Sequence, residues 1–215
     1  MSEIEQFFQM STDDRFEIYD AMIIKNESTD IDKHYIYHTA WAARILAETK
    51  PEIHTDISSS VSFNAIISAF IPTIFYDFRP PELSLDNLLT DFADLNELPC
   101  ADNSIESLSC MHVVEHIGLG RYGDPIDPNG DLKAISELTR VVSRDLLFVV
   151  PIGKPKVLFN LHRIYSYEQI IEYFKELKLI EFSLIPDKGN LIRNAPPALA
   201  DEQEYGCGCF WFRKD

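Results

Sequence analysis

Residues 94–116 read DLNELPCADNSIESLSCMHVVEH, and their pattern decides the fold class. Residues 105–111 are a short run of apolar or small residues that follows the turn cluster 101–104. Such a run is typical of a strand covered on both faces, as in parallel sheets. Open α/β sheets bind ligands beyond the carboxyl ends of their strands, so we expect residues 111–116 to meet a ligand.

The rest of the chain predicts an alternating α/β core with right-handed βαβ units. Further strands are expected at 53–57, 73–76, 89–93, 145–150, 179–185 and 206–213. Helices are expected at 63–70, 132–141 and 167–177, the last begun by a capping box from Ser166 to Gln169. Helical apolar spacing over 4–25 and 34–49 predicts an N-terminal helical flank or lid (1–50) before the core (51–215), in a single domain overall.

The order of an acidic residue, a Leu-Pro turn, an Asp-Asn-Ser turn, a strand and Val-Glu-His in residues 94–116 resembles class I S-adenosylmethionine-dependent methyltransferases. More closely, the chain resembles a family known only as a domain of unknown function with a methyltransferase-like core. The resemblance implies a Rossmann-like α/β fold, with a mainly parallel seven-stranded sheet, helices on both faces and an N-terminal helical extension. It also implies S-adenosylmethionine as the cofactor.

Two aspartates are the main candidates for cofactor binding. Asp77 follows Asp56 by about 20 residues, the spacing at which an acid meets ribose hydroxyls in dinucleotide folds. The resemblance places Asp94 near the adenine amine and Leu95 on the ring. Alternatively, both aspartates are ordinary strand-end or turn residues. The full predicted cofactor set is Tyr35, Asp56, Ser58, Ser59, Ser60, Asp77, Phe78, Asp94, Leu95, Met111 and His112.

The first motif departs from the family, because Ser58, Ser59 and Ser60 stand where a glycine-rich loop is usual. Glycine permits positive φ and close approach of the backbone to a ligand, which serine does less readily. Two interpretations stay open: a loop that still binds the cofactor, or a decayed pocket in a non-catalytic homologue. We favour retained binding, because both acidic positions persist.

Residues 112–116 also match the inverted zinc-protease pattern H-x-x-E-H, in which His112 and His116 would hold zinc beside Glu115 as the general base. Against this interpretation, His112 follows directly on the predicted strand, and no downstream helix offers a clear third ligand. In the family that the chain resembles, Glu-His often stands here without metal. We therefore expect no metal ion, and a zinc hydrolase is the less favoured alternative.

Methyl transfer needs a base for the acceptor, and His116 is the first candidate, with His112 as the second. The long loop 118–130 offers Arg121, Tyr122 and Asp124 to shape an acceptor. Lys154, Lys156, His162 and Arg163 form a cationic group after the last parallel strand. They suggest a phosphate or carboxylate on the acceptor, as in a nucleotide sugar or a surface-polysaccharide sugar. Ordinary solvated charges explain the group equally well.

Composition bounds the partners of this 215-residue chain. It is 46% hydrophobic with a net charge of −16, which fits a globular protein and opposes binding to nucleic acid or anionic membranes. The sequence shows neither a secretory signal nor a run of about 20 apolar residues, so we expect a cytoplasmic protein. Cys100, Cys110, Cys207 and Cys209 have no metal-ligand spacing and are expected to be reduced thiols.

These observations predict methyl transfer from S-adenosylmethionine to oxygen or nitrogen of a small molecule. The main alternative is a binding or scaffold protein that keeps the fold without turnover. A nicotinamide oxidoreductase is less favoured, since no G-x-G-x-x-G follows the first strand. The pattern carries no signal for the oligomeric state.

Overall fold

A computed structural model describes residues 31–215, and within them Asp32–Asp215 form one compact unit. The helix expected over residues 4–25 lies outside the described residues. None of the described helices has the length and apolar character that crossing a bilayer requires.

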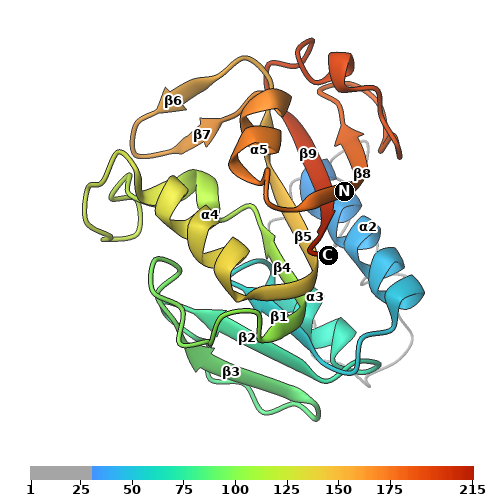
Figure 1. Cartoon of the computed structure of the whole chain (residues 1–215), viewed down its shortest axis with the longest axis vertical. Coiled ribbons are helices and arrows are strands. Elements are labelled where there is room, and N and C mark those ends of the chain that lie inside the picture. Colours follow the sequence, from blue (N-terminus) through green and yellow to red (C-terminus); the bar gives the residue numbers. More distant parts are fainter. Residues whose placement is uncertain (1–30) are drawn as a thin grey trace, which may run out of the picture. The chain divides into compact units, whose positions relative to one another are not determined.

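The core is a seven-stranded sheet with the order β3-β2-β1-β4-β5-β9-β8 (Figure 1). Its strands are β1 (His54–Ile57), β2 (Thr73–Asp77), β3 (Leu88–Phe92), β4 (Ile105–Met111), β5 (Val142–Ile152), β8 (Lys178–Ile185) and β9 (Gly206–Arg213). β1 to β5 pair in parallel, and β9 runs antiparallel between β5 and β8. The predicted mainly parallel seven-stranded sheet is confirmed.

Helices cover both faces of the sheet. The α-helices of residues 31–215 are α2 (Lys33–Thr49), α3 (Val61–Ile67), α4 (Gly130–Val141) and α5 (Tyr167–Tyr173). α2 and α3 pack on one face in a cluster that includes Trp41 and Leu147, whereas α4 and α5 pack on the other with Leu146 and Phe148. Leu146 and Leu147 point to opposite faces because side chains alternate along a strand. The described part of the expected N-terminal flank, α2, is therefore a layer of the core.

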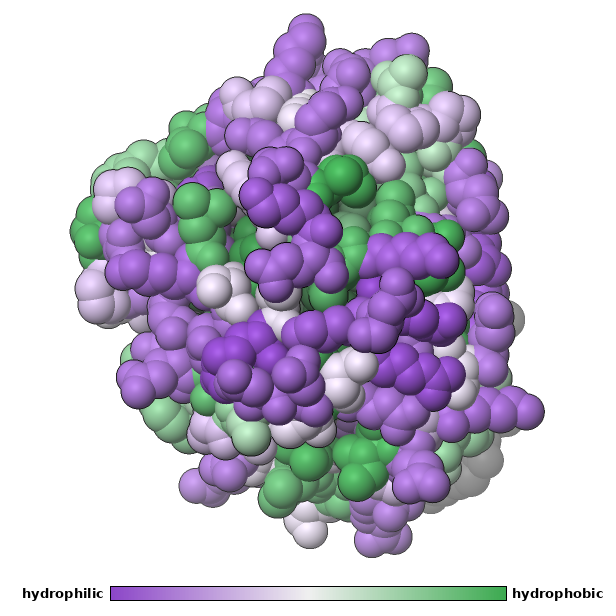
Figure 2. All heavy atoms as spheres, in the orientation of Figure 1, coloured by the Kyte–Doolittle hydropathy of each residue, from purple (hydrophilic) through white to green (hydrophobic). Residues whose placement is uncertain are grey.

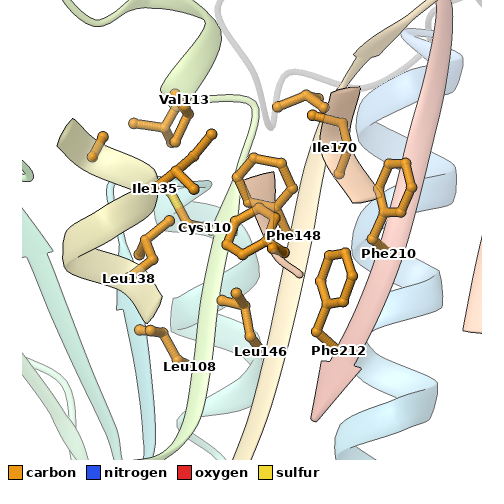
Figure 3. Close-up of a cluster of buried hydrophobic side chains, with 14 of the residues drawn as sticks. Leu108, Cys110, Val113, Ile135, Leu138, Leu146, Phe148, Ile170, Phe210 and Phe212 are labelled. Carbon is orange, nitrogen blue, oxygen red and sulfur yellow. The ribbon is translucent and has the colours of Figure 1, made fainter. Parts of the chain in front are cut away.

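The layer between the sheet and α4 and α5 is rich in aromatic side chains. Figure 3 shows Phe148, Phe210 and Phe212 from β5 and β9 gathered on the same side of the sheet as Leu138 of α4. Phe148 lies edge-on to Phe174, with the ring centroids 4.7 Å apart. All four phenylalanines are buried, and burial of such large apolar surfaces supplies the main drive for folding.

Local signals explain where several helices begin. Asp32 caps α2 by accepting a hydrogen bond from the backbone N–H of Tyr35. The predicted capping box is present, since Ser166 and Gln169 exchange side-chain to backbone hydrogen bonds at the start of α5. α5 ends at Tyr173, earlier than the predicted residue 177.

Three short elements were not predicted. A hairpin of β6 (Lys156–Leu158) and β7 (His162–Ile164) follows β5, and its strands are too short to give an alternating pattern. Two 3-10 turns complete the set: η1 (Val114–His116) follows β4, and η2 (Pro197–Leu199) precedes β9. The face of the molecule in Figure 2 is covered mostly by hydrophilic residues, as the high net charge suggests.

Candidate functional site

The serine loop, defined here as Ser58 to Ser60, connects β1 to α3 at the carboxyl edge of the sheet. Ser58 has φ +55°, the left-handed conformation that glycine adopts most easily. Its backbone N–H donates to Tyr76 O at 2.8 Å. Ser60 caps α3 by accepting from Phe63 N, and Ser59 Oγ accepts from Met111 N at 2.9 Å. The loop therefore has the backbone shape of a glycine turn without a glycine.

The side chain of Asp56, in β1, holds the serine loop through hydrogen bonds. Its side chain is fully buried and accepts hydrogen bonds from Ser59 N and Asn64 Nδ2, both at 3.0 Å, and from the Ser109 hydroxyl. Burial raises the pKa of Asp56 to about 6, although these hydrogen bonds oppose the shift. Asp56 thus holds the serine loop in place rather than facing solvent.

The predicted cofactor residues at the ends of β2 and β3 share the same edge, because β1, β2 and β3 pair in parallel. Asp77 ends β2 and accepts from Arg79 N at 2.7 Å, and Asp94 accepts from Asn96 N at 2.8 Å. The second carboxylate oxygen of each has no hydrogen-bond partner among residues 31–215. Leu95 and Met111 are buried, whereas Phe78 is exposed with its ring 5.5 Å from that of Phe92.

Beyond the end of β4 lies a cavity of about 380 Å³, which we call the histidine pocket. The start of α2, the end of β4, η1, the β6–β7 hairpin and the residue before β9 all contribute to its wall. Its lining includes Tyr35, His34, His112, Glu115, His116, Arg121, His162 and Tyr205. His38 packs behind it, with its ring 5.1 Å from that of His112. Five of the six histidines of the chain therefore meet at this one place.

His116 is oriented by a main-chain carbonyl. Its Nδ1 lies 2.6 Å from Leu161 O, and since a carbonyl only accepts, Nδ1 carries the proton. Nε2 is then the unprotonated nitrogen, 3.7 Å from the Glu115 carboxylate. Burial lowers the pKa of His116 below its usual value, which keeps the ring neutral at neutral pH. The ring therefore has the form that a general base requires.

His112 and Glu115 form a buried pair at the floor of the pocket. His112 Nδ1 lies 2.9 Å from Glu115 Oε1, and His112 Nε2 lies 3.3 Å from Cys207 Sγ. Burial lowers the pKa of His112 to about 4 and raises that of Glu115 to about 7. His112 has φ +58°, and its ring stacks against those of His34 and Tyr35.

The H-x-x-E-H motif is not displayed on an α-helix. His112 directly follows β4, and η1 is only a 3-10 turn, so His112 and His116 do not share the helix face that this zinc-protease motif needs. Among the described residues, the group that could hold a metal ion is instead His34, His112 and Cys207.

The predicted acceptor residues divide into two groups. Arg121 and His162 line the histidine pocket, and Tyr122 lies beside it with its ring 5.7 Å from that of His116. Asp124 instead accepts hydrogen bonds from backbone N–H groups of its own loop, including Gly118 N at 2.7 Å, which lowers its pKa.

The predicted cationic group is used mainly within the protein. Arg163 is buried, donates to Ile117 O at 2.7 Å and lies 3.4 Å from Asp131. Lys154 and Lys156 are exposed and each lies near Glu204, at 3.5 and 3.4 Å. Within the described residues, these three cations are therefore engaged away from the wall of the histidine pocket.

Sequence reasoning missed His34 and Tyr205, which line the histidine pocket, and His38 and Cys207, which lie against His112 behind it. One signal was present, since His34 and His38 are spaced i, i+4 in a predicted helix and so share a face. Cys207 and Cys209 are two apart on β9, so they lie on the same face of the sheet, with sulfurs 4.0 Å apart. All four cysteines are free thiols.

The strand order, the antiparallel β9 and the site at the carboxyl ends of β1 to β4 together define the class I methyltransferase fold. The family model described as "Caenorhabditis protein of unknown function, DUF268" matches residues 88–182. No curated protein matches the chain in sequence.

Solved structures confirm the fold. N-methyltransferase NodS from Bradyrhizobium japonicum WM9, in complex with S-adenosyl-l-homocysteine, has a TM-score of 0.59 at 12% identity and covers 82% of this chain and 85% of its own. A 1,6-didemethyltoxoflavin-N1-methyltransferase from Burkholderia thailandensis has a TM-score of 0.58 at 12% identity, covering 82% and 78%. The [4+2]-cyclase SpnF has a TM-score of 0.54 at 12% identity, covering 82% and 80%. At these identities the likeness shows the fold alone.

Proposed function

We propose that this protein transfers a methyl group from S-adenosylmethionine to an oxygen or nitrogen atom of a small molecule in the histidine pocket. The observation that supports the proposal most directly is that the serine loop and the histidine pocket lie on either side of two consecutive residues, Met111 and His112. Met111 N donates to Ser59 Oγ, and the next residue, His112, lines the pocket. A methyl donor at the loop and an acceptor in the pocket would therefore be neighbours, as in-line transfer requires.

The residues present fit the cofactor. The left-handed backbone at Ser58 gives the loop the turn that glycine usually provides. Asp77 and Asp94 offer carboxylate oxygens at the ends of neighbouring strands, suited to ribose hydroxyls and to the adenine amine. When bound, S-adenosylmethionine supplies an electrophilic methyl group on a sulfonium. NodS and the Burkholderia enzyme were solved with S-adenosylhomocysteine on the same fold.

The chain's own part in the reaction falls mainly to His116. Its unprotonated Nε2 removes the proton from the acceptor as the nucleophile attacks, and the Nδ1 contact with Leu161 O fixes the ring. Arg121 places a cation on the pocket wall and donates to Leu161 O at 2.9 Å. A sugar or phosphorylated acceptor stays a prediction, which now depends on Arg121 rather than on Lys154 or Arg163.

Calorimetric titration with S-adenosylmethionine and S-adenosylhomocysteine tests the proposal. We expect micromolar binding that weakens at least about tenfold in Asp77→Ala, because two hydrogen bonds to ribose hydroxyls are lost. Asp86→Ala is the matched control, since Asp86 is exposed and lies before β3 rather than at its carboxyl end, and it should bind as the natural chain does. No heat at millimolar cofactor, from protein that is folded by circular dichroism, would contradict the proposal.

The strained serine loop favours one second candidate, a binding protein that keeps the fold without methyl transfer. SpnF, described as a [4+2]-cyclase, has the same fold. Cofactor binding without formation of S-adenosylhomocysteine from any acceptor would support this candidate.

A further inference from the structure

Three potential metal ligands from segments far apart in the sequence converge beside the histidine pocket: His34 and His112 line it, and Cys207 is buried behind His112. One nitrogen each of His34 and His112 and the sulfur of Cys207 all lie within 4.8 Å of one another. His34 comes from the first turn of α2, His112 follows β4, and Cys207 lies in β9. The three residues are far apart in the sequence and come together only in the folded chain, so no local sequence motif contains them.

The spacing is close to that of ligands around one ion. In a tetrahedral zinc site, with bonds of about 2.0 Å to nitrogen and 2.3 Å to sulfur, a nitrogen and a sulfur ligand lie about 3.6 Å apart. His112 Nε2 and Cys207 Sγ are 3.3 Å apart. His34 is half-buried at the start of a helix, so its side chain can move the further short distance toward an ion.

Glu115 prepares His112 as a ligand. The hydrogen bond between Glu115 Oε1 and His112 Nδ1, at 2.9 Å, leaves the Nε2 lone pair facing Cys207 when Nδ1 holds the proton. A carboxylate behind an imidazole in this way is a regular feature of histidines that bind zinc, because it fixes the tautomer and strengthens the donor. Glu115 is 1% exposed, and a cation bound nearby would stabilise the charged form of this buried carboxylate.

A second observation indicates that a group belongs here. His38 is fully buried beside His112, and its Nε2 has no hydrogen-bond partner within residues 31–215. Glu115 Oε2 is also buried without a partner in this part of the chain. Buried polar atoms are rarely left unpaired, so unpaired atoms next to three potential ligands suggest an ion together with its bound water.

We infer that His34, His112 and Cys207 bind a zinc-class divalent transition metal ion, with the fourth ligand position open to the histidine pocket. Two imidazoles and one thiolate are the ligand types that zinc prefers over magnesium or calcium. Binding replaces the Cys207 thiol proton, which passes to solvent as the sulfur–metal bond forms. The open position would accept water or an acceptor oxygen.

The same contacts have the order of a cysteine–histidine–carboxylate triad, but burial argues against a nucleophile. Cys207 is 0% exposed, and burial raises the pKa of its thiol well above the usual value. A sulfur without exposed surface does not meet a substrate carbon, whereas a metal ion held between the ligand atoms of His34, His112 and Cys207 would bind the sulfur directly.

Cobalt titration of the full chain tests the site. The purified protein is treated with a chelator, and Co²⁺ is added while the ultraviolet thiolate-to-cobalt charge-transfer band is recorded. We expect one equivalent to bind and Zn²⁺ to displace it. Cys207→Ser should abolish the band, and His34→Gln should weaken binding about tenfold or more. His34 is half-exposed, so its variant keeps the core even if Cys207→Ser fails to fold.

Matched controls separate this site from general thiol and imidazole binding. Cys100→Ser removes a thiol away from the cluster, and His162→Gln removes an imidazole from the same pocket. Both should bind cobalt as the natural chain does. Absence of stoichiometric binding, a charge-transfer band that persists in Cys207→Ser, or equal weakening by His162→Gln and His34→Gln would each overturn the inference. The metal-free protein is used for S-adenosylhomocysteine titration, so this result stands apart from the proposed methyl transfer.

Discussion

Two buried polar clusters of this molecule differ in how completely their hydrogen bonds are made. In the first, which we call the polar ladder, His54 lies between Ser107 and Ser109 at 2.9 Å from each hydroxyl, and Ser109 donates to Asp56. In the second, the histidine pocket, Glu115 Oε2, His162 Nε2 and the adjoining His38 Nε2 lack partners within the described residues. The four residues of the ladder pair with one another and the adjoining Asn64 leaves one buried oxygen unpaired, whereas three unpaired atoms lie at the pocket, so the pocket is the better arranged of the two for something to bind.

The largest expected difference between the two clusters is in how much a substitution lowers the stability of the fold. His54→Ala removes a fully buried ring, deprives the buried Ser107 hydroxyl of this partner and leaves the Ser109 hydroxyl with Asp56 alone, so we expect the free energy of unfolding to fall by about 4 kcal/mol. His162→Ala is the matched change in the pocket, where one ring nitrogen is already unpaired, and it should lower stability by about 1 kcal/mol. Urea unfolding followed by circular dichroism measures both. Equal losses would show that the two clusters do not differ as the structure indicates.

The pH dependence of stability tests the ladder more finely. Burial raises the pKa of Asp56 from 3.8 to about 6, so between these values the folded state keeps a proton that the unfolded state has released. The contribution of Asp56 to the free energy of unfolding is therefore largest below pH 3.8. It decreases by about 3 kcal/mol in total as the pH rises to about 6.

Asp56→Asn removes this titration. The free energy of unfolding of the variant, relative to the natural chain, should rise between pH 4 and pH 6 and stay level above it. Urea titrations at several pH values supply the difference, in which the contributions of the other titrating groups largely cancel. A difference that does not change with pH would show that Asp56 keeps its ordinary pKa.

The sequence predicted the sheet better than either cluster, for a physical reason. Strand β4 was predicted with its observed bounds, because burial on both faces requires a continuous run of apolar or small residues. The last two strands, β8 and β9, were also predicted within one residue of their observed bounds, whereas the β6–β7 hairpin was too short to show a period. Local patterns therefore specify elements that bury apolar surface.

The histidine pocket could be predicted only in part. His112 and His116 were found because they directly follow a recognisable strand. His34 and Cys207 contribute through β-sheet pairing and helix packing over long sequence distances, which no local pattern records. Arg163 and Asp124 show the opposite failure, since a charged residue in a loop looks available in the sequence, yet each binds main-chain groups of the folded chain.

Within the histidine pocket, the sharpest test of the proposed chemistry is His116→Gln. Glutamine keeps a polar side chain but cannot take up a proton, so kcat for methyl transfer should fall about 100-fold. Affinity for S-adenosylhomocysteine should not change, because His116 lies in the acceptor pocket. Production of S-adenosylhomocysteine measures the first quantity and calorimetry the second. A loss of cofactor affinity with unchanged kcat would place His116 in the cofactor site instead.

The smallest expected effect concerns Ser58, which precedes Ser59, the residue that contacts both Asp56 of the ladder and Met111 beside the pocket. Its left-handed backbone opposes the preference of an L-residue by about 1 kcal/mol or more, whereas glycine adopts it freely. Ser58→Gly also loses the weak contact of Ser58 Oγ with Tyr76 O at 3.3 Å and adds chain entropy to the unfolded state. The net change in stability should therefore be a gain below about 1 kcal/mol, measured by urea unfolding.

Ser62→Gly, in the first turn of α3, is the control and should destabilise by about 1 kcal/mol because it places glycine in a helix. If both changes destabilised equally, the left-handed conformation at Ser58 would not be the source of strain, and the serine loop would differ from a glycine turn in shape as well as in sequence.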